Sequence, residues 1–375
     1  MKKHPSLAPP SRILVIALRH LGDVLLITPL VRSLHKAYPQ AQIDVLVFDN
    51  TAAILEGNPD INRIITTPLR PTHADYRHLV SQLFRRYGLA VITQTGDRPF
   101  IYGLLAASTR VAVVPKKDQK GAWKRYLVQY WTEFDDENTH TVLQLLKLTD
   151  LLGIARNYTL VSPQPTDYQT LPAFSGSSAY AVLHAYPMWH YKRWTINGWI
   201  ETAQFLQDSG LKVVLSGGPA PEEIDYINEI HRQLPPEVLN LAGKTSISQL
   251  ADIISRAKLY IGPDTGITHL AAAMGVPVIA LYGPTNPVKW APWPTNYDSD
   301  ENPFRKQGDQ QVNNIYLIQG TADCVPCHQE GCDRNRQSRS ACLENIRPEA
   351  IKKTIRLILN QEQEQSQQQK TTHAL

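Results

Sequence analysis

The chain has 375 residues, 42% of them hydrophobic, and a formal net charge of +4. This length predicts two domains with real cores, and the mild charge argues against nucleic acid as a main partner. The sequence lacks the run of about 18 apolar residues that a membrane-spanning helix requires. The first twelve residues lack the apolar centre of a secretory signal, so we expect a cytoplasmic protein.

The first half opens with a strand–helix–strand pattern. Residues 12–18 are a continuous apolar run, which is typical of a central parallel strand. A glycine turn follows, and then apolar residues recur at helical spacing up to Leu34. Either this helix starts at Asp23 and bends at Pro29, or Thr28 caps a second helix. Residues 43–48 form the next strand, so the pattern predicts a parallel sheet.

Asp23 lies at the carboxyl end of the first strand, in the glycine turn. Two roles are open for it. A carboxylate at the start of a helix is often only an N-cap. An ionised carboxylate there could instead act as a general base toward a hydroxyl group held against it.

Further strands are expected at 63–66, 89–93 and 110–114, and helices at 76–87, 100–107 and 141–152. The loop at 94–98 is a candidate for contact with an acceptor. Residues 115–131 then mix basic and aromatic side chains, including Lys116, Lys117, Lys120, Lys124 and Arg125. Such a run is usually a solvated face, but it also suits an anionic membrane surface.

The second half predicts another doubly wound α/β domain after a Ser/Gly-containing linker. We expect strands at 180–184, 212–215, 239–243, 258–261, 276–282 and 314–318, with helices at 197–207, 221–233, 248–257, 267–274 and 347–359. The predicted organisation is a flexible N-terminus (1–11), an N-terminal Rossmann-like domain (12–165), a linker (166–178), a C-terminal Rossmann-like domain (179–346), a terminal helix (347–360) and a disordered tail (361–375).

The segment at 258–285 reads as strand, sharp turn, helix and strand. Asp264 or Thr265 can cap the helix, which leaves N–H groups at Gly266 and Ile267 for an anion. His269 falls in the first turn beside them. The plain alternative is an ordinary capped helix. A second glycine turn after Tyr282 ends the next strand, where open α/β sheets bind their ligands.

All four cysteines lie late in the chain, at Cys324, Cys327, Cys332 and Cys342. Four close cysteines permit a structural zinc, although the spacing is not that of a strong zinc motif. Reduced thiols and a disulfide are the other possibilities.

Two Rossmann-like halves with a returning C-terminal helix describe the GT-B architecture of glycosyltransferases. The motifs resemble the family 9 glycosyltransferases, the ADP-heptose:lipopolysaccharide heptosyltransferases, over most of residues 12–358. The stretches that carry the resemblance are Leu21-Gly22-Asp23-Val24, Thr28-Pro29, residues 262–269 and Tyr282-Gly283-Pro284-Thr285. The start at 19–23 and the cysteine cluster with His328 look most like the heptosyltransferase III branch, which adds a heptose to the second heptose of the inner core.

The resemblance implies a fold, a donor, an acceptor and roles for particular residues. The fold would be α/β, with two Rossmann-like domains facing across a cleft. The donor would be ADP-heptose and the acceptor a lipid A–core glycolipid at the cytoplasmic face of the inner membrane, with peripheral contact to an anionic surface, no cofactor, no catalytic metal and no nucleic acid. Asp23 matches the proposed catalytic base, and the residues that match donor contacts are Lys192, Glu222, Lys244, Thr245, Asp264, Thr265, Gly266 and His269.

Other functions stay open from the sequence. The chain could be a heptosyltransferase of type I or II, or another nucleotide-sugar-dependent transferase of the same fold. From other classes, a nucleotide-sugar epimerase or a non-catalytic sugar-nucleotide-binding protein would also use this architecture.

Overall fold

A computed structural model describes residues 9–164 and 179–372, and the chain divides into two compact units. Unit 1 comprises Met1–Asp167 and Val288–Pro303, and unit 2 comprises Tyr168–Pro287 and Phe304–Leu375. The predicted linker at 166–178 lies outside the described residues, as do residues 1–8 of the predicted flexible N-terminus.

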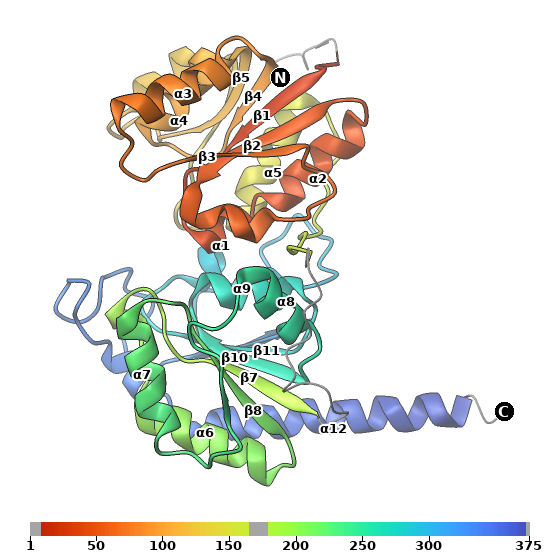
Figure 1. Cartoon of the computed structure of the whole chain (residues 1–375), viewed down its shortest axis with the longest axis vertical. Helices are drawn as coiled ribbons and strands as arrows, with labels where there is room; N and C mark the ends of the chain where they lie inside the picture. Colours follow the sequence, from red (N-terminus) through yellow and green to blue (C-terminus); the bar gives the residue numbers. More distant parts are fainter. Residues whose placement is uncertain (1–8, 165–178, 373–375) are drawn as a thin grey trace. The chain divides into compact units, whose positions relative to one another are not determined.

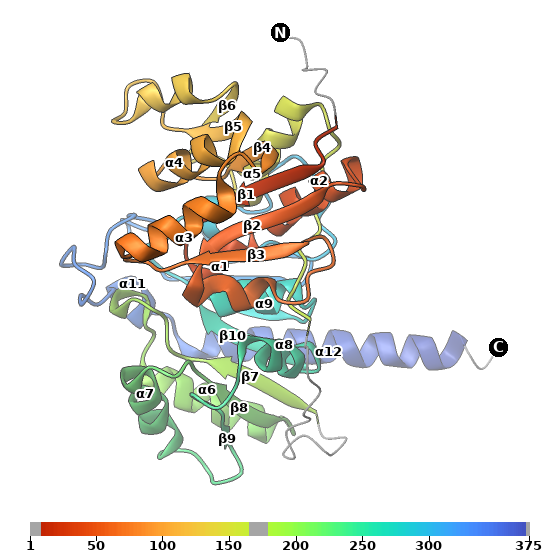
Figure 2. The same ribbon diagram turned by 45° about the horizontal axis from the view of Figure 1, so that its top comes forward.

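Unit 1 is built on a six-stranded, wholly parallel sheet of order β3-β2-β1-β4-β5-β6, which can be followed in Figure 2. In the central strand, Ile13 to Ile16 are fully buried, as the continuous apolar run predicts. Helices α2 and α5 cover one face and α3 and α4 the other (Figure 1). The strands are β1 (Arg12–Ile16), β2 (Gln42–Phe48), β3 (Arg63–Thr67), β4 (Tyr87–Ile92), β5 (Ala107–Val114) and β6 (Tyr130–Glu133).

The helices of unit 1 include two short 3₁₀ segments. They are α1 (Leu21–Leu25), α2 (Thr28–Ala37), η1 (Asp49–Leu55), α3 (His73–Leu83), α4 (Asp97–Ala106), η2 (Ala122–Leu127) and α5 (Thr141–Leu152). The choice that the sequence left open at Pro29 is resolved as two helices, although the N-cap of the second is Ile27 and Thr28 is its first residue. Pro29 stands in the first turn of α2, where its missing N–H costs nothing.

A returning segment, residues 288–303, completes unit 1 from the far end of the chain. Trp293 is only 2% exposed and packs in a cluster with Leu26 and Val142. The ring of His140 lies 4.8 Å from that of Trp293, and its Nε2 is 2.8 Å from the carbonyl oxygen of Ala291. Because His140 Nδ1 accepts the N–H of Val142, Nε2 is the donor to Ala291.

Unit 2 has a seven-stranded sheet of order β12-β13-β11-β10-β7-β8-β9, parallel except for β12. Ile261 of β10 pairs with Leu183 of β7 on one side and Ile279 of β11 on the other. In Figure 1, α8 and α9 cover one face and α6 and α12 the other. The strands are β7 (Tyr180–His184), β8 (Lys212–Ser216), β9 (Leu239–Asn240), β10 (Leu259–Pro263), β11 (Val278–Tyr282), β12 (Gln310–Val312) and β13 (Ile315–Gln319).

The helices of unit 2 follow the predicted order. They are η4 (His190–Lys192), α6 (Ile196–Asp208), α7 (Pro221–His231), α8 (Ile247–Ser255), α9 (Gly266–Ala273), α11 (Ala341–Glu344) and α12 (Pro348–Thr372), while α10 (Pro287–Trp290) spans the boundary between the units. The prediction of a disordered tail from 361 needs correction, since α12 continues to Thr372. Gln, Glu and Lys are good helix formers, so low complexity there does not end the helix.

Candidate active site

The turn after β10 carries a carboxylate and the start of a helix. Thr265 is the N-cap of α9, and its side chain accepts the N–H of Thr268. The hydroxyl of Thr268 in turn lies 2.5 Å from the carbonyl oxygen of Pro263 and 3.0 Å from the hydroxyl of buried Tyr260. This network fixes the first turn of α9. By helix geometry the N–H groups of Gly266 and Ile267 lack intrahelical partners, which makes this turn suited to an anion.

Asp264 and Lys192 form an ion pair at this turn, with Lys192 Nζ 2.5 Å from Asp264 Oδ2. The pair joins the loops that follow β10 and β7. Burial opposes ionisation of Asp264, but the charge and hydrogen bond of Lys192, with a hydrogen bond from Thr285, outweigh it and lower the pKa of the carboxyl. Tyr282 donates to Asp264 Oδ1 over 3.4 Å, and burial together with that carboxylate raises the pKa of Tyr282.

His269 is 5% exposed in the first turn of α9, and its charge contributes to the lowered pKa of Asp264. The structure thus brings five predicted donor residues to one edge of the sheet. They are Lys192, Asp264, Thr265, Gly266 and His269. Because β7, β10 and β11 are parallel, the loops after their carboxyl ends meet there.

Glu222, Lys244 and Thr245 follow β8 and β9 at the same edge of unit 2. Glu222 is exposed in the first turn of α7, where its Oε2 accepts a hydrogen bond from Tyr186 over 3.4 Å. Lys244 is also exposed and donates to the carbonyl of Asn240 over 2.9 Å. Glu222 and Lys244 are therefore open to a ligand, while Thr245 is half-buried.

The neighbouring Glu223 was not singled out from the sequence. Its carboxylate lies against the turn after β8, and a Cβ atom at Gly218 would come within 2.7 Å of its Oε2. Burial raises the pKa of Glu223, while a hydrogen bond from the Gly218 backbone opposes that shift. A glycine pair that ends a strand and precedes two glutamates is the signal that could have pointed to it.

Asp23 lies in unit 1, in the first turn of the five-residue helix α1. The N-cap of that helix is His20, so the capping role that the sequence left open for Asp23 is not the one found. Asp23 is 14% exposed at its side chain, and its Oδ2 is 3.5 Å from Nε of Arg19. It is therefore a partly open carboxylate beside a cation at the carboxyl end of β1.

The returning segment, residues 288–303, lies next to Arg19. The Arg19 guanidinium lies 6.0 Å from the ring centre of Trp290, and Lys289 Nζ lies 5.7 Å from the same ring. Lys289 is fully buried and donates to the carbonyl of Asp135 over 2.6 Å. Burial lowers the pKa of Lys289 to about 8. Sequence reasoning missed this lysine because residues 288–303 are distant in the chain from the unit they complete.

Fewer cations of the basic–aromatic run at 115–131 are exposed than the sequence predicts. Lys124 is buried, pairs with Asp97 at 2.6 Å and lies over the ring of Phe100. Arg125 packs over Trp131 and bonds to the carbonyl of Ala122. Both are structural cations, so they are removed from the expected membrane-contacting set. The exposed members are Lys117, Lys120, Trp123 and Tyr126, with Lys116 half-buried.

The four cysteines carry free thiols, with Cys342 buried and Cys324 and Cys332 exposed. Within the described residues, no group of three or more His, Cys, Asp or Glu side chains is placed to hold a metal ion. Burial raises the pKa of the Cys342 thiol to about 11, and Cys327, Cys332 and Cys324 add to that shift, so the four thiols lie near one another. The structural zinc stays a prediction. Cys332 Sγ accepts the N–H of Ala341 over 3.4 Å.

Two Rossmann-like sheets, with the N-terminus of α9 at the carboxyl edge of the second, are the architecture expected of a GT-B glycosyltransferase. The profile of glycosyltransferase family 9 (heptosyltransferase) matches residues 105–316. A lipopolysaccharide heptosyltransferase 3 of Escherichia coli is 31% identical over 340 residues, which cover 80% of this chain and 93% of that protein. The chain belongs to glycosyltransferase family 9.

Two further comparisons agree. The heptosyltransferase 3 of Escherichia coli K12 is 28% identical over 85% of this chain and 100% of its own length. The solved structure of the E. coli ADP-heptose lps heptosyltransferase II matches with a TM-score of 0.70 over 94% of this chain and 99% of that one, at 24% identity. The structural match confirms the predicted GT-B fold.

Proposed function

We propose that this chain transfers heptose from ADP-L-glycero-D-manno-heptose to an inner-core heptose of lipopolysaccharide, as a heptosyltransferase of type III. The observation that carries the proposal is the match to the heptosyltransferase 3 proteins of E. coli over 93% and 100% of their lengths. Unit 2 supports it with a cation and a helix N-terminus at one turn, which suit a diphosphate.

The proposed reaction is a direct displacement with inversion. The acceptor oxygen forms a bond to the anomeric carbon, the bond from that carbon to the ADP phosphate breaks, and Asp23 takes the hydroxyl proton. Lys192 and the N–H groups at Gly266 and Ile267 stabilise the charge that grows on ADP, as preorganised donors do. Cationic and N–H groups can fill the role of a metal ion here, so we propose no catalytic metal.

Glu222, Lys244 and Thr245 are proposed to hold the nucleoside of the donor. A carboxylate accepts hydrogen bonds from ribose hydroxyl groups, and the exposed position of Glu222 leaves it open for them. His269 is proposed to contact the phosphate or the sugar from the first turn of α9.

We also propose that the enzyme works at the cytoplasmic face of the inner membrane as a peripheral protein. Within the described residues, no helix is of the length and apolarity that crossing a bilayer demands. Peripheral contact would use Lys116, Lys117 and Lys120 with the exposed rings of Trp123 and Tyr126, since basic and aromatic side chains together suit an anionic lipid surface.

The direct test is product analysis. The full chain is incubated with ADP-heptose and a deacylated core oligosaccharide that ends at the second inner-core heptose. We expect a product that is larger by one heptose, together with ADP. An acceptor truncated one sugar earlier is the matched control and should stay unchanged. Conversion of the donor without acceptor would instead indicate an epimerase, and binding without turnover a non-catalytic protein.

A further inference from the structure

The α3–α4 face of unit 1 exposes more apolar side chains than the rest of the described chain. Of nine large apolar side chains that are exposed in the described residues, seven lie on this layer and its loops. They are Leu69, Tyr76, Phe84, Ile101, Leu104, Trp123 and Tyr126, while Met188 and Leu357 are the two in unit 2. Clusters of this kind mark interaction sites, whereas single exposed apolar residues do not.

Helix α3 has two apolar faces. Leu79 and Leu83 are buried against the sheet, as an amphipathic helix requires. Tyr76, Val80 and Phe84 follow one another at four-residue spacing on another face, and Phe84 is 53% exposed. A helix that needed only to cover the sheet would carry polar residues there.

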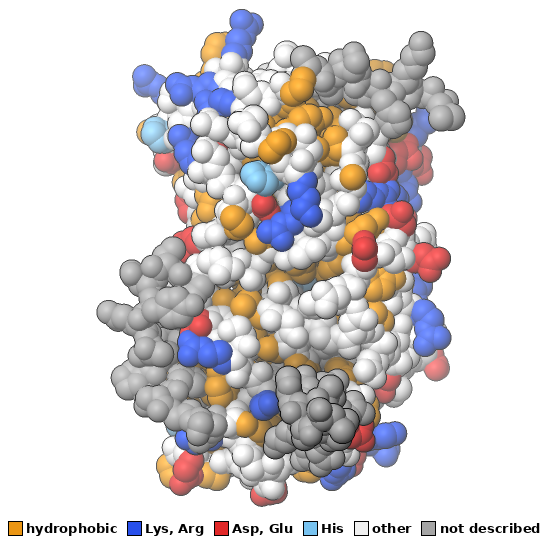
Figure 3. Space-filling view, turned by 90° about the vertical axis from the view of Figure 1, so that its right-hand side faces the viewer, with side chains coloured by type: hydrophobic (Ala, Val, Ile, Leu, Met, Phe, Trp, Pro, Cys, Tyr) orange, Lys and Arg blue, Asp and Glu red, His pale blue; other side chains and the backbone are white. Residues whose placement is uncertain are grey.

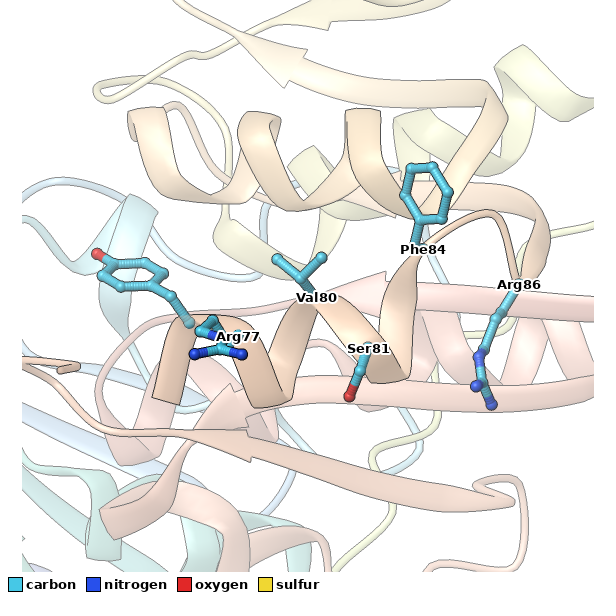
Figure 4. Close-up of a pocket in the computed structure, with 6 residues that line it drawn as sticks. Arg77, Val80, Ser81, Phe84 and Arg86 are labelled. Carbon is cyan, nitrogen blue, oxygen red and sulfur yellow. The ribbon is translucent and has the colours of Figure 1, made fainter. Parts of the chain in front are cut away.

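This second stripe lines a shallow pocket whose remaining walls are Arg77, Ser81 and Arg86. Figure 4 shows Val80 and Phe84 pointing from α3 to the same side, toward a neighbouring helix. On α4, Ile101 and Leu104 are 52% and 42% exposed. The two adjacent helices therefore present apolar side chains with arginines among them.

The charge of this region is predominantly positive. Residues 61–132 contain twelve Lys and Arg but only three Asp and no Glu, although the whole chain carries just +4. Asp75 is engaged in the capping box of α3 and Asp97 is paired with Lys124. Arg77 and Arg86 line the pocket and are exposed, and Arg70 and Arg85, which flank α3 in the sequence, are exposed as well. The face in Figure 3 differs, because it mixes acidic and basic side chains.

We infer that the α3–α4 face docks the enzyme on an anionic lipid bilayer, with Tyr76, Phe84, Ile101 and Leu104 entering the interfacial region and the arginines binding lipid phosphates. This inference rests on the proposed function for its choice of partner, and it extends the contact well beyond the loop at 116–126. Apolar area and cations together are what interfacial binding requires.

Vesicle flotation tests it on the full chain, with vesicles of phosphatidylethanolamine and phosphatidylglycerol against vesicles of phosphatidylcholine. We expect binding to the anionic vesicles only. Phe84→Ser with Ile101→Ser should weaken it about 10-fold through lost apolar burial. Arg77→Gln with Arg86→Gln should weaken it on the order of 10- to 30-fold and reduce its dependence on salt.

The matched control removes one cation and one apolar side chain from α12, as Lys353→Gln with Leu357→Ser, and should bind like the wild type. Thermal melting of each variant checks its fold, and the arginine pair keeps the test valid if the apolar pair unfolds. Transfer to the deacylated acceptor should be unchanged in all variants. If the wild type itself does not transfer heptose to this acceptor, the proposed function is wrong, while the flotation result remains valid.

Four results would overturn the inference. The wild type could ignore anionic vesicles, or both α3–α4 variants could bind them as well as the control does. A change in sedimentation of the Phe84/Ile101 variant without a change in flotation would show that the face binds a second copy of the chain. Reduced transfer to the deacylated acceptor would assign the pocket to the acceptor.

Discussion

Asp264 in unit 2 and Asp23 in unit 1 hold equivalent positions, and their surroundings differ. Each follows a central strand of a parallel sheet and has a cation beside it. Asp264 pairs with Lys192 at 2.5 Å and also accepts hydrogen bonds from Tyr282 and Thr285. Asp23 lies 3.5 Å from Arg19, and the side chain of Arg19 is 44% exposed. The lone pairs of Asp264 are engaged by its partners, so this carboxylate serves to hold its turn in place. Asp23 has a more distant partner, so its lone pairs can accept a proton.

The largest effect should come from the loosely held carboxylate. Asp23→Ala should lower the transfer rate about 10²- to 10⁴-fold, the range for loss of a general base, and leave ADP affinity unchanged. Steady-state kinetics and calorimetric titration measure the two. Asp49→Ala removes an exposed carboxylate at the end of the neighbouring strand and should keep full activity. Wild-type turnover in Asp23→Ala would end the general-base assignment.

Removing the fixed partner should damage binding and stability together. Lys192→Met leaves Asp264 buried without its cation, so unfolding should require about 3 kcal/mol less. ADP should bind at least 10-fold more weakly, because the cation is also lost from the proposed diphosphate site. Chemical denaturation and calorimetry check this, with exposed Lys212→Met as the control at the far end of β8. An unaltered ADP affinity would remove Lys192 from the donor site.

The dependence of stability on pH tests the burial of Lys289, which belongs to unit 1 as Asp23 does. Its pKa is about 8 in the fold and near 10.4 unfolded, so the unfolded chain holds the extra proton between these values. The stability contribution of this group should therefore rise with pH from about 8 to 10, on the order of 2 kcal/mol. The groups that face it are Asp135, Asp136, Arg19 and Lys147.

Denaturation of wild type and Lys289→Met at pH 7, 8, 9 and 10 isolates this contribution. The difference in unfolding free energy should shift in favour of the wild type as the pH rises. A constant difference across the series would show that the Lys289 ammonium is not destabilised by burial.

The smallest effect separates capping from binding. Thr265 and Thr195 both cap helices of unit 2 through their side-chain oxygens. Thr265→Ala and Thr195→Ala should each cost about 1 kcal/mol of stability. Only Thr265→Ala should also weaken ADP binding, by a few-fold, because it alone disturbs the turn at Asp264. Equal ADP affinity in the two variants would contradict this.

The fold was largely predictable because long apolar runs such as residues 12–18 and 276–282 identify buried parallel strands. β6 and β12 were missed, since these short outer strands carry mixed side chains and lack such a pattern. The Lys192–Asp264 pair joins residues 72 positions apart, which a local pattern cannot register. The burial of Lys124 was equally hidden, because the nearby Trp123 and Tyr126 are exposed.

The returning segment has a consequence for biogenesis. Trp293 and Asn302 fill and bond unit 1 only after more than a hundred residues of unit 2 have been made. During translation the α5 side of the N-terminal sheet therefore stays uncovered until residue 303 has been synthesised and has left the ribosome. For the same reason, a fragment that stops at residue 167 should be a poor substitute for the N-terminal half, and swapping halves between relatives requires grafting residues 288–303 as well.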